Sequence, residues 1–154
     1  MTAACIIREA RTSDLDALAG LLGLLFALEA DFAACATDTQ RQKRGLTLLL
    51  QGRQRLVLVA DADGLVVGMA TAQVGVSTAE GGPALLVEDV VVRPESRGQG
   101  IGRALLKRIE AWGADLGATR LQLLADKDNA PAFDFYRACG FHTTNLVCLR
   151  RTLP

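Results

Sequence analysis

The sequence is poor in the residues that build metal centres. It has one histidine, His142, and four cysteines that are scattered along 154 residues without a Cys-x-x-Cys pair. Because zinc sites need clusters of such ligands at short spacing, we expect no metal to be bound. The cysteines are expected to be reduced, packed thiols of a cytoplasmic protein: Cys5, Cys35, Cys139 and Cys148.

The chain also lacks an excess of charge of either sign. It carries 17 basic and 17 acidic residues, so no overall field draws it to nucleic acid or to an anionic membrane. Its longest apolar stretch, residues 17–28, is about half as long as a membrane-spanning helix and lies between Asp16 and Glu29. No pattern of a secretory signal opens the chain. We therefore expect a cytoplasmic protein without membrane or nucleic-acid partners.

Hydrophobic residues, in contrast, are abundant. They make up 50% of the chain, which is high for a soluble domain, and part of this surplus is expected to be buried between the subunits of a homodimer. No repeat, low-complexity tract or linker interrupts the sequence. Residues 1–154 are therefore predicted to form one domain.

Hydrophobic periodicity and turn residues predict the order β-α-α-β-β-β-α-β-α-β. The expected strands cover residues 6–8, 55–60, 65–74, 84–92, 120–125 and 146–152. The expected helices cover residues 12–28, 39–50, 101–116 and 131–139. This order predicts an α/β or α+β fold in which a mixed sheet carries helices on both faces.

Residues 90–106 join a hydrophobic strand to a helix through a glycine-rich loop. Three glycines stand at alternate positions of this loop: Gly98, Gly100 and Gly102. Glycine tolerates unusual backbone angles and lets a ligand come close, and the helix start offers unpaired N–H groups and a positive dipole end. Arg97 and Arg103 add permanent positive charge. The segment therefore predicts a site for a pyrophosphate or a similar anion.

Two nucleotide-binding motifs are excluded by the residues around the glycines. The dinucleotide motif Gly-x-Gly-x-x-Gly needs a third glycine where this chain has Arg103, and Pro94 prevents the tight join of strand and helix that this motif requires. No Walker lysine follows the glycines. The predicted anion site must therefore belong to a different class of ligand-binding motif.

The pattern Arg97-x-x-Gly100-x-Gly102 resembles the acyl-CoA-binding motif of the GNAT superfamily of N-acetyltransferases. A second segment, residues 129–141, resembles the downstream motif of the same family. Five residues of that motif are in place: Asn129, Ala132, Tyr136, Gly140 and Phe141. The resemblance covers about residues 84–142. It implies a mixed, mostly antiparallel sheet of six to seven strands that is splayed at an acyl-CoA cleft, and it is nearest in its strand motif to the diamine and small-amine acetyltransferases.

For the donor, the resemblance implies acetyl-CoA as co-substrate. The pantetheine arm would pair with the backbone of Val90 and Val92, and Asn129 would also reach CoA unless it is only a helix cap. The pyrophosphate would lie on the backbone amides of a seven-residue stretch: Arg97, Gly98, Gln99, Gly100, Ile101, Gly102 and Arg103.

For catalysis, the resemblance implies Glu88 as the base that takes a proton from the amine and Tyr136 as the acid that protonates the departing thiolate. Glu88 could instead be a structural hydrogen-bond acceptor, and Tyr136 lies on a helical stripe that is typical of a core. Successive strand residues face opposite sides, so only one of Glu88 and Asp89 is expected to face the cleft, and Asp89 is interpreted as structural.

In the resembling family the first two helices form the wall of the acceptor site. Phe26, Glu29 and Phe32 fall in this region, and carboxylates beside aromatic rings suit a small cationic amine. The predicted reaction is direct attack of a primary amine on acetyl-CoA in a ternary complex. A protein or peptide N-acetyltransferase and a non-catalytic CoA-binding regulatory module remain as alternatives.

Overall fold

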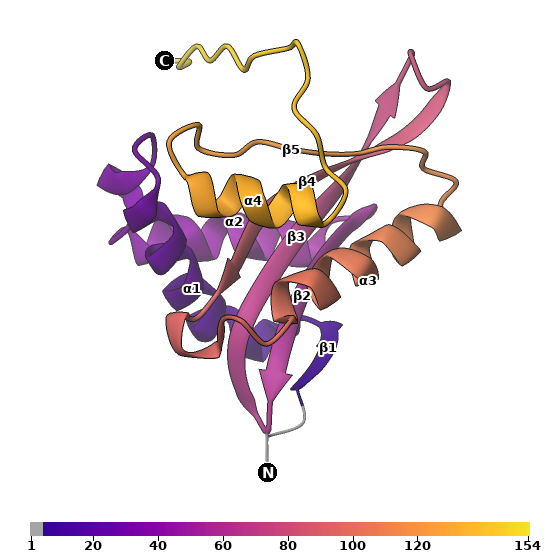
Figure 1. Ribbon diagram of the computed structural model, residues 1–154. Helices are drawn as coiled ribbons and strands as arrows, with labels where there is room; N and C mark the ends of the chain where they lie inside the picture. The colour runs from indigo at the N-terminus through magenta and orange to yellow at the C-terminus, as the bar shows by residue number, and fades with distance from the viewer. Residues whose placement is uncertain (1–4) are drawn as a thin grey trace. The chain divides into compact units, whose positions relative to one another are not determined.

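The computed structural model describes residues 5–154. Its chain divides into two compact units, Met1–Leu123 and Leu124–Pro154. The first unit holds all the strands and three of the helices, and the second holds one helix and the C-terminal segment (Figure 1).

Five strands are present among residues 5–154, and they form one sheet in the order β1-β2-β3-β4-β5. Their bounds are Cys5–Glu9, Arg55–Ala62, Leu65–Ser77, Gly82–Val92 and Leu121–Leu123. Strands β1 to β4 are antiparallel to their neighbours, and β5 runs parallel to β4. The mixed, mostly antiparallel sheet is confirmed, but six to seven strands is wrong.

The missing strand is the one predicted at residues 146–152. The segment contains no strand, and the side chains of Leu146, Val147 and Leu149 are 82–91% exposed. A strand needs a neighbour for its backbone N–H and C=O groups, and within the described residues no strand pairs with this segment. A run of hydrophobic residues indicates β propensity, but it does not show that a neighbouring strand is present to pair with the segment.

Four helices are present among the described residues, within a few residues of their predicted bounds. They cover Leu15–Leu28 (α1), Thr39–Gln51 (α2), Ile101–Asp115 (α3) and Ala130–Ala138 (α4). The Asp38 side chain caps α2 by accepting a hydrogen bond from the Arg41 amide. Thr12–Asp14, predicted to cap the first helix, forms a 3-10 turn directly before α1, and Asp14 takes the N-cap position.

Helices lie on both faces of the sheet in the first unit, as predicted. On one face, Val59 of β2 and Met69 of β3 share a buried core with Leu18 of α1 and Leu46 of α2. On the other face, Gly113 of α3 lies so close to β4 that a Cβ atom there would come within 2.8 Å of Leu85 Cδ1. These two layers of helices enclose the central strands. We call the first the α1/α2 face.

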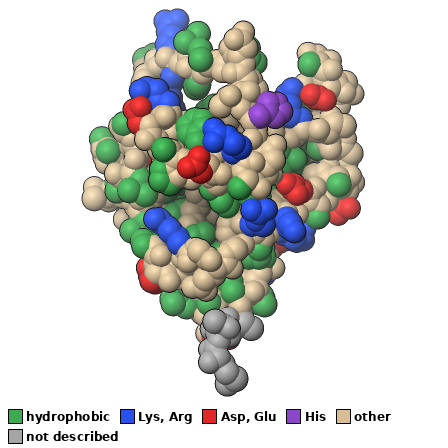
Figure 2. Space-filling view, in the orientation of Figure 1, with side chains coloured by type: hydrophobic (Ala, Val, Ile, Leu, Met, Phe, Trp, Pro, Cys, Tyr) green, Lys and Arg blue, Asp and Glu red, His purple; other side chains and the backbone are tan. Residues whose placement is uncertain are grey.

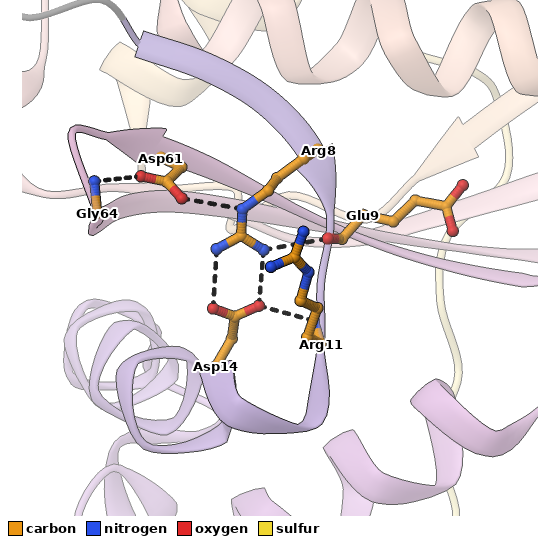
Figure 3. Close-up of polar contacts among 6 residues, drawn as sticks. All are labelled: Arg8, Glu9, Arg11, Asp14, Asp61 and Gly64. Carbon is orange, nitrogen blue, oxygen red and sulfur yellow. Dashed lines mark hydrogen bonds and ion pairs between the residues drawn. The ribbon is translucent and has the colours of Figure 1, made fainter.

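An arginine ties the start of the chain to the sheet and to α1 (Figure 3). The Arg8 guanidinium donates to both carboxylate oxygens of Asp14, at 2.9 and 3.0 Å, and to Asp61 Oδ2 at 2.9 Å. Asp14 also accepts from the Arg11 amide, and Asp61 accepts from the Gly64 amide in the β2–β3 turn. One cation thus joins β1, the turn before α1 and the hairpin.

Candidate active site

The pairing of β3 with β4 is interrupted by a β-bulge. Thr71 lies opposite Glu88, and Met69 lies opposite Val91, so one residue of β3 faces two residues of β4. The inserted residue is Asp89, whose φ of +52° lies in the left-handed region. A bulge of this kind bends the strand and changes which side chains share a face.

Because of this bulge, Glu88 and Asp89 present their carboxylates on the same face of the sheet. Glu88 shares its face with its register partner Thr71, and the Thr71 Oγ1 hydroxyl donates to Asp89 Oδ2 at 3.1 Å. The prediction that only one of the two acids faces the site was therefore wrong. It assumed a regular strand, in which neighbouring side chains alternate, and the left-handed residue breaks that alternation.

The two carboxylates have different surroundings. Glu88 is exposed and accepts a hydrogen bond from Gln73 Nε2 at 3.4 Å. Burial, together with the nearby charge of Glu88, raises the pKa of Asp89 to about 6, although the hydrogen bond from Thr71 acts in the opposite direction. The face that both acids share is the α1/α2 face, because Thr71 is paired with Val57 of its core.

Beyond the bulge, β4 has one edge without a neighbouring strand. Strand β5 pairs with β4 only from Leu85 to Val87, and within residues 5–154 no other strand lies on that edge. The Arg93 amide donates to the Val67 carbonyl of β3, so the backbone of Arg93 faces β3. Because backbone N–H and C=O groups alternate in direction along a strand, those of Val90 and Val92 point to the open edge. There Arg97 Nε donates to the Val92 carbonyl at 3.0 Å.

The glycine-rich loop has the backbone that its sequence predicts at two positions. Gly98 and Gly100 have φ of +75° and +79°, and no heavy atom beyond the adjacent residues lies within 4 Å of where their Cβ atoms would be. Gly100 caps α3, whose first turn has N–H groups without acceptors inside the helix. Gly102 lies inside the first turn. An exposed loop with this room fits the phosphates of an acyl-CoA.

The proposed wall residues lie at the end of α1. The rings of Phe26 and Phe32 are 5.5 Å apart and tilted by 46°, and the Phe32 amide donates to the Glu29 carbonyl. Phe26 packs against the same core that covers the α1/α2 face. The first unit thus holds Glu88 and this aromatic pair on one side of its sheet.

The second unit, Leu124–Pro154, holds Asn129 and Tyr136. Asn129 Oδ1 accepts from the Ala132 amide at 3.1 Å, which makes it the cap of α4. The Tyr136 ring is half-buried and contacts Phe135 and Phe141, at centroid distances of 5.1 and 5.7 Å. These local roles are the ones that the sequence leaves open beside CoA binding and catalysis.

Sequence reasoning missed Thr71 and Gln73, the two β3 residues that hold the acids. A pair of polar residues at alternate positions of an apolar strand, Thr71 and Gln73, was a detectable signal. Their partners could not be named, because the register across the bulge is a property of the folded sheet.

The remaining expectations concern metals, membranes and thiols. Within residues 5–154, no helix is long and apolar enough to cross a membrane, and no group of three His, Cys, Asp or Glu residues could hold a metal ion. Side chains of both charge signs are interspersed on the face drawn in Figure 2. The four thiols are free, but Cys5 and Cys148 are exposed, so the prediction that they are packed was wrong.

The model of the acetyltransferase (GNAT) family matches residues 24–141. An aminoglycoside N(6')-acetyltransferase type 1 of Stenotrophomonas maltophilia is 36% identical over 93 residues, which cover 58% of this chain and 61% of that enzyme. A thialysine N-epsilon-acetyltransferase of Bos taurus is 39% identical over 56 residues, 36% of this chain and 33% of that enzyme. The matched parts span less than two thirds of either relative.

Among solved structures, an aminoglycoside N-acetyltransferase in complex with CoA has the same fold. It superposes with a TM-score of 0.83 over 99% of this chain and 97% of that one, at 21% sequence identity. At that identity the likeness establishes the architecture alone.

Proposed function

The chain belongs to the acetyltransferase (GNAT) family, and on that premise we propose that it moves the acetyl group of acetyl-CoA to a primary amine of a small molecule. The amine attacks the thioester directly, in a ternary complex. The observation that carries the proposal is the β4 edge, which opens at the bulge and leads into the Gly98–Gly100 turn and α3. An extended donor can pair with this edge while its phosphates take the helix start.

In the proposed reaction, different residues bind the donor and move the proton. The backbone of Val90 and Val92 and the loop from Arg97 to Arg103 bind and align the donor, which supplies the activated acetyl thioester. Such alignment can account for about 7–11 kcal/mol of a barrier. Glu88, exposed and oriented by Gln73, takes the proton of the amine.

On the second unit, Tyr136 gives a proton to the departing thiolate of CoA. Asn129, besides capping α4, also contacts acetyl-CoA. Phe26, Glu29 and Phe32 line the amine site, where a carboxylate and two rings favour a cation. The names of the relatives support a small amine, since they act on aminoglycosides and thialysine. We further propose a single catalytic domain that works as a cytoplasmic homodimer.

Replacing Glu88 by Gln tests the proposed base. Gln keeps the size and the contact with Gln73 but cannot take a proton, so we expect kcat/KM at neutral pH to fall by about 10²-fold or more. The measurement is the initial rate of CoA formation between pH 6 and pH 9. Glu110→Gln, the same change on the exposed side of α3, is the matched control and should leave the rate unchanged. A Glu88→Gln profile that matches wild type would exclude Glu88 as the base.

Two other functions make different predictions. A peptide acetyltransferase would turn over peptides and ignore diamines, amino sugars and amino acids. A CoA-binding module would gain thermal stability with acetyl-CoA and turn over no amine. The exposed Glu88 between Gln73 and the half-buried Asp89 favours an enzyme, because a binding module needs no such base.

A further inference from the structure

We propose that Thr71 and Asp89 are positioning residues, which lock the β4 bulge and thereby present the edge from Val90 to Val92 to the acyl donor. The identity of the donor rests on the proposed function. The lock itself follows from the left-handed conformation of Asp89 inside β4 and from its hydrogen bond with the buried Thr71 hydroxyl.

Asp89 adopts a backbone conformation that its position in a strand does not favour. Three residues other than glycine have positive φ among the described residues: Gln54, Asp63 and Asp89. Asp63 lies in the β2–β3 turn, where a tight hairpin requires left-handed residues, and Gln54 directly precedes β2. Asp89 lies inside β4, so its conformation persists only if the surrounding contacts hold it.

The contact that holds Asp89 comes from a rigid donor. Thr71 is fully buried, with 0% of its surface exposed, and its Oγ1 hydroxyl donates to Asp89 Oδ2 at 3.1 Å. A β-branched side chain has a stiff χ1, so the position of this Oγ1 atom is restricted. A buried hydroxyl also needs an acceptor, so each group stabilises the other in place.

The cost of keeping an acid at this position supports a role for its side chain. Glycine would take the left-handed conformation without strain and without burying a charge. Burial and the neighbouring Glu88 instead disfavour the ionised form of Asp89. A conformational requirement alone would therefore be better met by glycine, and the carboxylate gains its value from the bond with Thr71.

The bulge decides what the open edge of β4 presents. With one residue inserted, Val91 lies opposite Met69, and the backbone groups of Val90 and Val92 point away from β3. If the bulge relaxed into regular pairing, the register would slip by one residue and these groups would turn toward β3. The Thr71–Asp89 bond thus keeps the backbone groups of Val90 and the N–H of Val92 on the open edge for the donor, while the Val92 carbonyl accepts from Arg97.

The test compares four variants by calorimetric binding of acetyl-CoA and by steady-state kinetics. Thr71→Val removes the hydroxyl at constant shape, and we expect acetyl-CoA to bind about tenfold more weakly. The KM for acetyl-CoA should rise by the same factor, while the KM for the amine stays constant. Thr71→Ser should restore binding. Asp63→Ala, which alters another left-handed aspartate in an exposed turn, is the matched control and should bind as wild type.

Asp89→Gly provides a second route if Thr71→Val does not fold. Glycine keeps the left-handed backbone available but lacks the acceptor, so acetyl-CoA should again bind about tenfold more weakly. If both variants bind acetyl-CoA as tightly as wild type, the lock is wrong. A loss of folded protein without a change of KM would mark a merely structural role and would also contradict the inference.

The amide hydrogen exchange rates of Val91 and Arg93 measure how firmly β4 is paired with β3 beside the bulge, in the absence of any ligand. Both residues pair with β3, and both amides should exchange faster in Thr71→Val and return to the wild-type rate in Thr71→Ser. A wild-type protein that binds no acetyl-CoA would overturn the proposed function, while unchanged exchange in Thr71→Val would overturn the lock. The two failures are therefore distinguishable.

Discussion

At the scale of single residues, Asp89 is an acid whose ionisation opposes folding. Its pKa is raised to about 6 in the folded protein from an ordinary value of 3.8, so the folded state holds the proton more firmly than the unfolded state. The free energy of unfolding therefore decreases as the pH rises through about 4 to 6. At pH 7 the ionisation of Asp89 lowers the free energy of unfolding by about 3 kcal/mol.

Asp89→Asn should remove this cost and keep the contact with Thr71, because Asn has an acceptor oxygen and tolerates a positive φ. We expect the variant to be more stable than wild type at pH 7.5, by up to about 3 kcal/mol. The gain should vanish below about pH 3, where the Asp89 carboxyl of the wild type is protonated in both the folded and the unfolded state. Urea unfolding at the two pH values measures it, and an equal difference at both would contradict the assigned ionisation.

At the scale of elements, the Arg8 cluster attaches β1 to the β2–β3 hairpin and to the start of α1 (Figure 3). The Arg8 guanidinium lowers the pKa of both Asp14 and Asp61. A lowered pKa means that the stabilisation is complete above the ordinary carboxyl pKa and is lost as the pH falls through the folded values. This pH dependence has the opposite sign to that of Asp89.

Arg8→Met should lower Tm by about 5 °C or more at pH 7, because it leaves Asp14 and Asp61 without their cation. The difference from wild type should shrink below about pH 4 as the two acids become protonated. Differential scanning calorimetry at pH 7 and pH 3 measures both effects. Arg53→Met, at an exposed arginine outside the cluster, is the control. A loss of Tm that does not depend on pH would point to packing rather than charge.

The sequence predicted elements more completely than their pairing. Periodicity and caps located the four helices and the five strands that form, because these signals are local. The family resemblance implied a splayed strand, usually with a bulge, but the bulged residue could not be named, because Asp89 contacts Thr71, 18 residues earlier. The strand expected at residues 146–152 failed for a similar reason, since a strand exists only with a partner.

The same limit applies to the candidate site. Gly98 and Gly100 could be recognised because positive φ selects glycine, and the structure shows positive φ at both. The side chain that orients Glu88 could not be recognised, because Gln73 reaches it only through the register of β3 and β4. Local chemistry was readable from the sequence, and non-local contacts were not.

At the scale of the whole molecule, the chain belongs to the acetyltransferase (GNAT) family, and its reaction and its acceptor are proposals. The homodimer expected from the high hydrophobic content also stays a prediction. Exposed Cys5 and Cys148 affect how activity is assayed, because a thiol reagent would react with the protein as well as with CoA. Chromatographic separation of CoA avoids this background.

The most direct test is the yield of CoA and of acetylated amine when the protein is incubated with acetyl-CoA and a panel of diamines, amino sugars, amino acids and peptides. The proposed function predicts that at least one small primary amine gives CoA and its N-acetyl derivative in equal amounts, faster than without protein. Acetyl-CoA that is bound but yields no CoA above the spontaneous rate with any amine would contradict it.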